Sequence, residues 1–545
     1  MKFSKWNISL FNPKDPLKEI LHLRKIEKVK EFLDPSYDLI SSDNAMAQLK
    51  TAAKRIRQAI VLKEKIGIFM DYDADGICGG AIIYKTLNDL GNEPCYLVPH
   101  RREGYGLSKN ATRYFIKEKI NLLITVDCGI KSVLEVANLN KQKIDTIVVD
   151  HHQLDEILPQ SYAIVHPKIL KKGKICSDLS GGGVAYMLCR ELYNRNGREK
   201  WLLDLAAISS VADVVPLVED NRTIVKYGML VLNKTKNLGL RHLIEVANLK
   251  MGEIGCYEIG FMVAPRLNAA GRVSNPQDSF KLLITKDEGE AKKLAQKLNE
   301  LNIKRQKLLE NGQNEACEIV GTKGLFKKNL IIVRGQWNEG IVGLIASKLV
   351  EKFNRPAIVL TEIDEKIKGS ARSIPQIDIT KLISKSSDCL LSFGGHSQAA
   401  GLSLVKSKFK KFEKSILNYA QKINKNVFEK CLNIDALIES SQIKMQLADD
   451  LEKLEPYGAG NPKPIFAVEK IKVDSIRSIG RDQSHRKVTF IKSNHYHQAV
   501  LFNFAQGNWI IAKGDILDIA FCIDINRWNG NEKIDLILKD VKENE

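Results

Sequence analysis

Short hydrophobic runs alternate with a segment of helical periodicity in the first part of the chain. IGIFM (66–70), EPCYLVP (93–99), NLLITV (121–126) and DTIVV (145–149) have the length of strands, whereas ICGGAIIYKTLNDLG (77–91) has helical spacing. Strands that alternate with helices form βαβ units around a parallel sheet. The pattern therefore predicts an α/β domain that begins near residue 66.

A long amphipathic helix is predicted between Glu288 and Val320. Its apolar positions recur at helical spacing and are Ala291, Leu294, Ala295, Leu298, Leu301, Leu308, Leu309, Ala316 and Ile319. At 1.5 Å per residue such a helix spans roughly 45–50 Å, which is more than one domain needs. We therefore expect this helix to connect two domains.

Two further regions follow the long helix. The strands LIIV (330–333) and PAIVL (356–360) flank a helical pattern, IVGLIASKLVEKF (341–353), and indicate a second α/β region. After the turn-rich EPYGAGNPKP (455–464) the pattern changes to short strands and turns, which is typical of a small barrel such as an OB-fold. The strands are FAVEKIKV (466–473), KVTFIK (487–492), HQAVLFNF (497–504), DILDIAFCIDI (515–525) and KIDLILKDV (533–541).

These patterns predict an α/β fold in four parts. The first is a parallel-sheet domain with an N-terminal extension at 1–285, whose motif core is 60–220, and the second is the connecting helix at 286–321. The third is another α/β domain at 322–455, and the fourth is the barrel at 456–545. Because the barrel reaches the end of the sequence, we expect no further C-terminal domain.

Composition and charge narrow the class of protein. The 545 residues are 44% hydrophobic and 27% charged, which excludes a disordered or fibrous chain. No eighteen apolar residues run together and the start is broken by charge and proline, so we predict a cytoplasmic protein without a membrane partner. The formal charge of +18 favours a polyanionic partner such as nucleic acid, although a low-GC coding bias would also raise Lys. The ten cysteines include no C-x-x-C pair, which argues against a zinc ribbon or a disulfide framework.

Three aspartates stand close together directly after the first strand, in DYDADG (71–76). Carboxylates this close repel one another unless a cation lies among them. An EF-hand loop is a competing interpretation, but its twelfth position needs a Glu where Ile82 stands, and a strand precedes the motif. A turn with solvated aspartates remains the alternative for this hexapeptide alone.

Further ligands follow the next elements. One strand ends in Asp127, the following strand ends in Asp150, His151 and His152, and an apolar helix ends at Asp213. The carboxyl ends of parallel strands line one crevice, so these groups are expected to meet there. The candidate metal ligands are Asp73, Asp75, Asp127, His151 and Asp213. Oxygen and nitrogen donors without thiolate suit two Mn²⁺ or Mg²⁺ ions, which would support phosphoester hydrolysis.

The ordered motifs DYDADG, VDCGI, VDHHQ, VADVVPL and GGHSQAAG (394–401) resemble the DHH phosphoesterase superfamily. More closely, the chain is similar to the RecJ family of bacterial single-strand-specific 5′-to-3′ DNA exonucleases. The other segments that carry this resemblance are PHRREGYGLS (99–108), PRLNAAGR (265–272), LNELNIKRQ (298–306), WNEGIVG (337–343), GSARS (369–373) and EPYGAGNP (455–462).

The resemblance implies a DHH domain, a DHH-associated domain, an OB-fold and two bound Mn²⁺ or Mg²⁺ ions. It implies that His152 faces the scissile phosphate as a hydrogen-bond donor or acid, and that Asp71 stands nearby as a less secure ligand. Arg272 would reach the transition-state phosphate and Arg266 would be structural. The alternative for either arginine is a surface or interdomain salt bridge. Asn338 departs from a frequent family histidine, which puts an acid-base role there in doubt.

The resemblance also implies a grip on the end of the strand. Arg101, Ser370 and Arg372 would hold the terminal phosphate, with Gly369 just before Ser370 and Ala371 between Ser370 and Arg372. Gly394 and Gly395 would let the backbone approach the substrate, and His396 would donate to a phosphate or a base unless it is a satisfied interdomain histidine. The basic segments 404–430 and 462–492 would track the strand unless they are simply solvated. Candidate stacking aromatics are Phe466, Phe490, Phe502, Phe504, Trp509 and Trp528, several of which must be barrel core.

The function implied is a single-stranded-DNA-specific 5′-to-3′ exonuclease that releases 5′-mononucleotides in DNA repair and recombination. The implied partners are single-stranded DNA, a single-stranded-DNA-binding protein and a RecQ-type helicase, and the protein would be a monomer. Two alternatives stay open: a phosphodiesterase acting on nanoRNA or cyclic dinucleotides, and a non-catalytic scaffold that binds single-stranded DNA. Inorganic pyrophosphatase also belongs to the superfamily, but neither the length of the chain nor the long helix calls for it.

Overall fold

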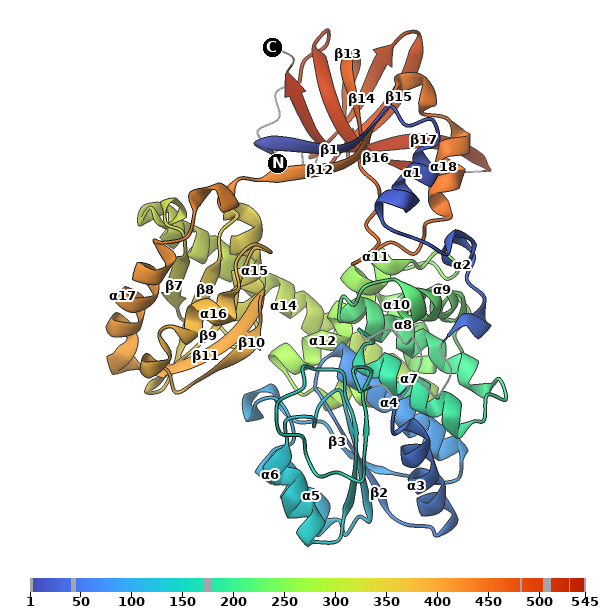
Figure 1. The fold of residues 1–545 in the computed structure, drawn as a ribbon, viewed down its shortest axis with the longest axis vertical. Coiled ribbons are helices and arrows are strands. Elements are labelled where there is room, and N and C mark those ends of the chain that lie inside the picture. The colour runs from blue at the N-terminus through green and yellow to red at the C-terminus, as the bar shows by residue number, and fades with distance from the viewer. Residues whose placement is uncertain are drawn as a thin grey trace. The chain divides into compact units, whose positions relative to one another are not determined.

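The computed structural model describes residues 3–40, 46–169, 178–480, 483–502, 511–528 (without the side chain of Trp528) and 530–543 (Figure 1). Its contacts divide the chain into two compact units. One unit contains Ser36–Asn424 with Gly458–Gly460, and the other contains Met1–Pro35, Lys425–Tyr457 and Asn461–Glu545. We describe the two units in turn.

A five-stranded parallel sheet forms the centre of the first domain, in the order β3-β2-β4-β5-β6. Successive side chains point to opposite faces, so Ile68 joins the core under α3 and α4 while Phe69 joins the core under α5. Both faces are covered, which is why the strands read as continuous apolar runs. The strands are β2 (Ile66–Met70), β3 (Cys95–Leu97), β4 (Leu122–Val126), β5 (Asp145–Val149) and β6 (Ala163–Val165). The helices around them are α3 (Leu49–Val61), α4 (Ala74–Asp89), α5 (Lys109–Lys117), α6 (Val133–Lys141) and α7 (Gly181–Leu192).

A group of helices completes the first domain. Helix α8 is buried from Leu203 to Ser210 because α4, α7 and α9 pack around it, and it ends at Asp213. An apolar sequence without a polar face is what such a central helix requires. The helices are α8 (Leu203–Ala212), α9 (Glu219–Leu232), α10 (Leu238–Val246), α11 (Cys256–Glu258), α12 (Ala264–Val273) and α13 (Gln277–Ile284).

Helix α14 (Glu288–Thr322) is 35 residues long and begins after the N-cap Asp287. At 1.5 Å per residue it is about 52 Å long. Ala295 and Leu298 on its first half join the core of the first domain, whereas Ala316 and Val320 on its second half join a core of the next domain. One helix therefore belongs to both domains and ties them together.

The second domain is a five-stranded sheet in the order β10-β11-β9-β8-β7, in which only β7 and β8 are parallel. Helix α15 covers the face that also meets α14, and α16 and α17 cover the other face. The strands are β7 (Ile331–Gly335), β8 (Ala357–Ile363), β9 (Lys366–Arg372), β10 (Ser392–His396) and β11 (Ala399–Val405). The helices are α15 (Val342–Phe353), α16 (Ile379–Ser384) and α17 (Phe409–Ala420).

The second unit is a closed barrel in which β13 pairs with β14 on one side and with β16 on the other. Phe466 and Phe490 are buried in it, so these two candidate stacking residues are core. Phe502 is 53% exposed, whereas Phe504, Trp509 and the side chain of Trp528 lie outside the described residues. The strands are β12 (Cys431–Leu437), β13 (Phe466–Ile479), β14 (His485–Lys492), β15 (His495–Leu501), β16 (Ile516–Trp528) and β17 (Asn531–Glu543), and α18 (Met445–Glu452) packs beside them.

The N-terminal segment belongs to the barrel unit. Strand β1 (Lys5–Phe11) pairs in parallel with β12, and Figure 1 shows it in blue beside the orange strand. Trp6 donates its indole N–H to Asp540 at 2.8 Å, and α1 (Pro16–Leu23) and α2 (Val29–Leu33) pack on the same core. The contacts thus divide the chain differently from the expected boundaries 1–285 and 322–455, because these strands pair across more than 400 residues of sequence.

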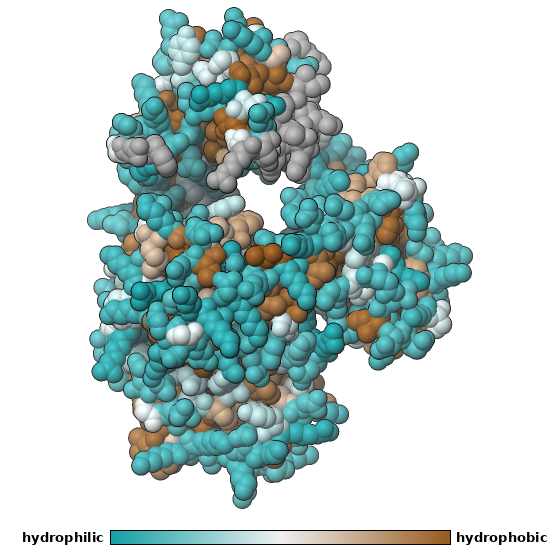
Figure 2. Space-filling view, turned by 180° about the vertical axis from the view of Figure 1, so that it is seen from behind, coloured by the Kyte–Doolittle hydropathy of each residue, from teal (hydrophilic) through white to brown (hydrophobic). Residues whose placement is uncertain are grey.

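Hydrophilic residues cover most of the face that Figure 2 shows, and hydrophobic residues gather there in small groups. Within the described part of the chain, no helix combines the length and the apolar character needed to cross a membrane.

Candidate active site

The turn after β2 places two aspartates at the start of α4. Asp73 is the N-cap, and its Oδ1 accepts the backbone N–H groups of Asp75 at 3.0 Å and Gly76 at 3.2 Å. Gly76 lets this turn close, since a Cβ there would lie 2.6 Å from the carbonyl oxygen of Asp71. The motif therefore holds its carboxylates on a rigid turn at the edge of the sheet.

Asp75 is buried against the first turn of α7. Its carboxylate accepts the N–H groups of Gly181 and Gly182, each at 2.8 Å, and the hydroxyl of Ser209. A helix N-terminus favours a carboxylate because its N–H groups have no partner within the helix. A Cβ on Gly181 would lie 2.6 Å from Cβ of Asp127, so glycine is needed where this helix meets the site.

Asp127 and His151 follow β4 and β5. Asp127 adopts the left-handed conformation, with φ of 60°, and its Oδ1 lies 3.1 Å from Nε2 of His151. The same nitrogen is 3.6 Å from Asp75, and Nδ1 of His151 is 3.8 Å from Asp213 at the end of α8. Oxygen and imidazole ligands from four chain segments thus converge.

Three groups of side chains lie close enough to hold a metal ion. They are Asp127 with His151 and His152, Asp75 with His151 and Asp213, and Asp71 with Asp73 and Asp127. We call Asp71, Asp73, Asp75, Asp127, His151 and Asp213 the carboxylate cluster. It contains all five predicted metal ligands and adds Asp71, which the motif alone had left as a less secure ligand.

The electrostatics of this cluster suit a divalent cation. Burial, then the charge of Asp73, raises the pKa of Asp71 well above its usual value, and burial, then Asp75, does the same for the pKa of Asp127. Desolvation, then Asp75 and Asp73, raises the pKa of Asp213 to about 9 although about a third of its side chain is exposed. Oδ1 of Asp71 and of Asp127 accept no hydrogen bond from the described residues. Mutually repelling carboxylates together with an imidazole are the donor set that Mn²⁺ and Mg²⁺ take.

His152 is oriented by the residue two positions before it. The buried Asp150 accepts the backbone N–H groups of Ile130, His151 and His152, and its Oδ1 lies 2.8 Å from Nδ1 of His152. Burial lowers the pKa of His152, but the hydrogen bond to Asp150 and the negative charges of Asp150 and Asp75 together outweigh burial, so the pKa is raised overall. Because Nδ1–H faces Asp150, Nε2 is the ring atom left for a substrate.

The second domain contributes His396 from β10. The rings of His152 and His396 lie 6.4 Å apart with an interplanar angle of 23°. His396 is exposed along with the rest of β10, and desolvation followed by the charge of His152 lowers its pKa. The predicted substrate-binding histidine therefore faces the predicted catalytic one across the two domains.

Three predicted arginines gather beside the carboxylate cluster. Desolvation, then Arg101 and Arg305, lowers the pKa of Arg272 to about 9, and desolvation, then Arg101, lowers the pKa of Arg372. Arg272 donates to the carbonyl of Gly340 at 3.0 Å, and Arg101 lies 4.7 Å over the ring of Tyr72. Desolvated guanidinium groups that repel one another form a site for an anion.

Ser370 completes this group, which we call the arginine pocket (Arg101, Arg272, Ser370 and Arg372). Arg372 donates to the Ser370 hydroxyl at 2.9 Å. A Cβ on Gly343, at the start of α15, would lie 3.0 Å from both side chains, so glycine brings that helix start against the pocket. Backbone N–H groups of a helix start add to the attraction for phosphate.

The remaining predicted residues, Gly394, Gly395 and Arg266, lie in local contacts of the backbone or of neighbouring side chains. Gly395 has φ of 145° and a Cβ there would strike the carbonyl of Ala399, whereas no described atom lies within 4 Å of a Cβ on Gly394. Of these two glycines, Gly394 has open space beside it, whereas Gly395 is needed for the backbone conformation and the close approach to Ala399. Arg266 bonds to Asn299 and to the carbonyl of Met262.

Asn338, which stands where the family often has a histidine, makes a local structural contact. Its side chain accepts the N–H of Gly340 at 2.8 Å in the turn that precedes α15. This role needs an acceptor and no titratable group.

Part of the positive charge of the two basic segments is paired. In 404–430, Lys406 contacts Glu362 at 3.2 Å and Lys411 contacts Asp388 at 2.8 Å. In 462–492, Lys463 contacts Asp524 at 3.2 Å. The net charge of these segments therefore overstates what they can offer to a polyanion.

Arg305 is a functional candidate that sequence reasoning did not single out, whereas Asp150 was expected at the crevice but without a role of its own. Arg305 lies in the LNELNIKRQ segment and is among the cations that depress the pKa of Arg272. Asp150 precedes the two histidines, and its role could be inferred only once the structure showed that it is buried.

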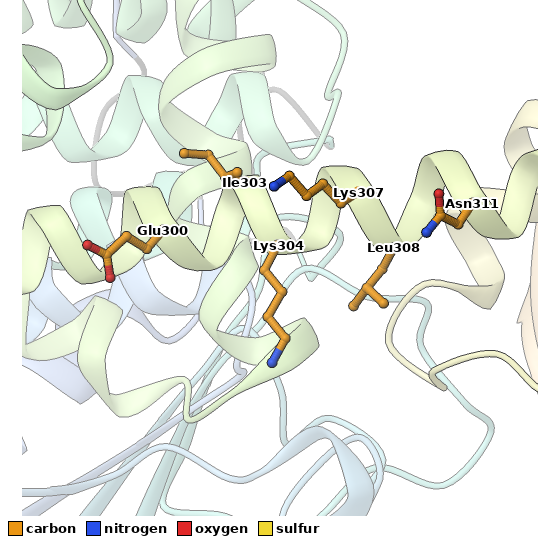
Figure 3. Close-up of a pocket in the computed structure, with 6 residues that line it drawn as sticks. All are labelled: Glu300, Ile303, Lys304, Lys307, Leu308 and Asn311. Atoms are coloured by element: carbon orange, nitrogen blue, oxygen red, sulfur yellow. The ribbon is translucent and has the colours of Figure 1, made fainter.

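Figure 3 shows a hollow on α14 whose lining residues belong to neither of these groups. Six residues of this one helix line it, namely Glu300, Ile303, Lys304, Lys307, Leu308 and Asn311. Catalytic sites bring polar groups together from several elements. We therefore place the chemistry at the carboxylate cluster and assign none to this hollow.

Family models match three parts of the chain. They are the DHH family N-terminal domain at 65–210, the DHHA1 domain at 327–422 and the RecJ OB domain at 434–540. These matches confirm the predicted succession of a parallel-sheet domain, a second α/β domain and a C-terminal barrel.

Curated relatives and solved structures agree with these matches. The single-stranded-DNA-specific exonuclease RecJ of Haemophilus influenzae is 31% identical over 549 residues, covering 96% of this chain and 95% of that one. That of Bacillus subtilis is 37% identical over 499 residues, and the chain spans only 63% of its length. The structure of Thermus thermophilus RecJ in complex with Mn²⁺ superposes with a TM-score of 0.84 at 27% identity, over 99% of this chain and 80% of that one. The chain belongs to the RecJ family.

Proposed function

We propose that this protein is a metal-dependent exonuclease that degrades single-stranded DNA from the 5′ end and releases 5′-mononucleotides. The observation that carries the proposal is the meeting of the carboxylate cluster with the arginine pocket. One binds cations and the other binds phosphate, which is the arrangement that phosphodiester hydrolysis needs. Relatives named single-stranded-DNA-specific exonucleases support the substrate.

Two divalent ions, Mn²⁺ or Mg²⁺, are the cofactors that the cluster fits, with Asp73, Asp75, Asp127, His151 and Asp213 as ligands. When bound, such a pair activates water and neutralises charge on the phosphate. Solved RecJ structures in complex with Mn²⁺ and with Mg²⁺ support these metals.

The remaining residues bind and orient the substrate. Nε2 of His152 faces the scissile phosphate and donates to the leaving oxygen, and Arg272 stabilises the charge that develops on phosphorus oxygens. Arg101, Ser370 and Arg372 bind the 5′-terminal phosphate, and this grip sets the polarity. Gly394, Gly395 and His396 form the surface against which the first nucleotide lies.

The cellular setting is also part of the proposal. The protein acts in DNA repair and recombination in the cytoplasm, as a monomer, on strands supplied by a RecQ-type helicase and covered by single-stranded-DNA-binding protein. The alternative scaffold without catalysis predicts lost metal ligands, yet here every predicted ligand lies in the cluster.

Polarity tests the proposal. Purified protein with Mn²⁺ is incubated with 5′-phosphorylated single-stranded DNA labelled at either end. The proposal expects early release of the 5′ label as mononucleotide, while the 3′ label stays on progressively shorter strands. Early release of the 3′ label, or cleavage confined to short oligonucleotides or dinucleotides, would contradict it.

A further inference from the structure

The loop before α5 holds one tyrosine against the active site. Tyr105 stands between Gly104 and Gly106, whose φ angles are 93° and 87°. Two left-handed glycines turn the chain sharply on either side of it, a conformation that other residues rarely adopt. The side chain is 46% exposed, so it is not held there by burial alone.

The hydroxyl of Tyr105 makes two contacts at once. It donates to the main-chain carbonyl of Asp127 at 3.0 Å and lies 2.8 Å from Nδ1 of His152. Because its hydrogen is given to Asp127, its oxygen accepts the Nδ1–H that Asp150 shares at 2.8 Å. The two rings also pack, with centroids 5.0 Å apart and an interplanar angle of 55°.

The carbonyl that Tyr105 binds belongs to a strained residue. Asp127 is not a glycine and yet has φ of 60°, a conformation that persists only when its surroundings fix it. One hydroxyl therefore connects the main chain of a candidate metal ligand to the imidazole that faces the substrate.

We propose that Tyr105 is a positioning residue, whose hydroxyl fixes the His152 imidazole relative to Asp127. This rests on the proposed function. There, water attacks phosphorus and releases a proton to solvent, the bond between phosphorus and the 3′ oxygen breaks, and that oxygen takes a proton from Nε2 of His152. Solvent then returns a proton to His152. Tyr105 keeps Nε2 aimed at the leaving oxygen throughout.

Tyr105→Phe is the informative variant because it keeps the ring packing and removes both hydrogen bonds. We expect kcat on 5′-phosphorylated single-stranded DNA to fall about tenfold, the order seen when an orienting partner of a site is lost, with KM within about twofold. Tyr114→Phe on α5 removes a hydroxyl outside the site and serves as the matched control, with unchanged kcat.

Substrates with different leaving groups distinguish a loss of His152 positioning from a general disturbance of the active site. In a strand whose first linkage carries sulfur in place of the 3′ bridging oxygen, the thiolate leaves without a proton. Tyr105→Phe and His152→Ala should therefore each reduce the rate of cleavage of this substrate by less than about twofold relative to wild type. On ordinary DNA, the double variant Tyr105→Phe/His152→Ala should lose no more activity than His152→Ala alone. Equal slowing of both substrates by Tyr105→Phe would overturn the proposal.

Metal affinity provides a readout that is independent of turnover. Titration of the protein with Mn²⁺, followed by electron paramagnetic resonance, should give the same affinity for Tyr105→Phe and wild type. A fall in affinity that parallels kcat would overturn the proposal, because Tyr105 would then act through the metal ligands. A loss in His152→Ala without one in Tyr105→Phe overturns the role of Tyr105 alone, whereas full activity in His152→Ala overturns the role of His152 in the proposed function and that of Tyr105 with it.

Discussion

The carboxylate cluster and the arginine pocket each bring desolvated groups of like charge close together, but the two are assembled from different parts of the fold. The cluster comes from one domain, where strand ends and helix ends meet at the edge of a single sheet. The pocket takes Arg101 and Arg272 from the first domain and Ser370 and Arg372 from β9 of the second. Metal binding should therefore depend on the first domain, whereas the grip on phosphate also depends on how the second domain is held.

Removal of one cluster carboxylate should have the largest effect. Asp127→Asn keeps the shape of the side chain but removes its charge, and we expect cleavage to fall by more than about 10³-fold, in line with the loss of charge stabilisation at a reacting phosphate. Cleavage is measured on end-labelled DNA, and fluorescence anisotropy of labelled single-stranded DNA serves as the binding control. Binding without cleavage is expected, and retained cleavage would remove Asp127 from the mechanism.

Replacement of Arg272 should have the next largest effect on cleavage. Arg272→Gln should lower kcat about 10²-fold because its desolvated guanidinium no longer stabilises the developing charge. Arg266→Gln is the matched control on the same helix, since Arg266 already bonds to Asn299 and Met262. Equal losses in the two variants would mean that this helix needs its arginines for folding only.

The phosphate grip of the second domain should have a smaller effect. Wild type should prefer a 5′-phosphate over a 5′-hydroxyl strand, and Arg372→Gln should reduce that preference about tenfold, the order of one charged hydrogen bond. Arg334→Gln in the same sheet, where Arg334 pairs with Glu362 at 2.8 Å, is the control. An unchanged preference in Arg372→Gln would place the terminal phosphate elsewhere.

Metal binding should change stability by the smallest amount, a few degrees in Tm. The pKa of Asp213 is raised to about 9 in the metal-free fold from about 4 in an unfolded chain, so the folded state holds its proton more tightly. This contribution to stability is complete below about pH 4 and is lost as pH rises toward about 9. Mn²⁺ relieves the same repulsion, so the rise in Tm on adding it should be larger at pH 8 than at pH 6. Scanning calorimetry measures this, and an equal rise at both pH values would contradict it.

Much of the first domain could be predicted because its strands are buried on both faces. IGIFM, NLLITV and DTIVV became β2, β4 and β5, and the side chains after them converge as parallel strand ends do. The pairing of β1 with β12 could not be predicted, because a seven-residue alternating pattern does not identify a partner more than 400 residues away.

The missed parts of the site share one physical cause. Tyr105 and the orienting role of Asp150 depend on burial or on contacts across loops, which local sequence pattern does not report. Arg305 becomes visible only when α14 brings it near Arg272. Residue type and position at the ends of strands and of α8 therefore predicted which side chains meet in the carboxylate cluster, whereas the residues that orient them required the fold.

The most direct test is a crystal structure with Mn²⁺ and a 5′-phosphorylated single strand whose first linkage resists hydrolysis. Anomalous scattering at the manganese edge locates the ions, and the density locates the terminal phosphate. We predict two manganese peaks within the carboxylate cluster and the 5′-phosphate against Ser370 and Arg372. Manganese outside the cluster, or the 3′ end of the strand in the arginine pocket, would contradict the account.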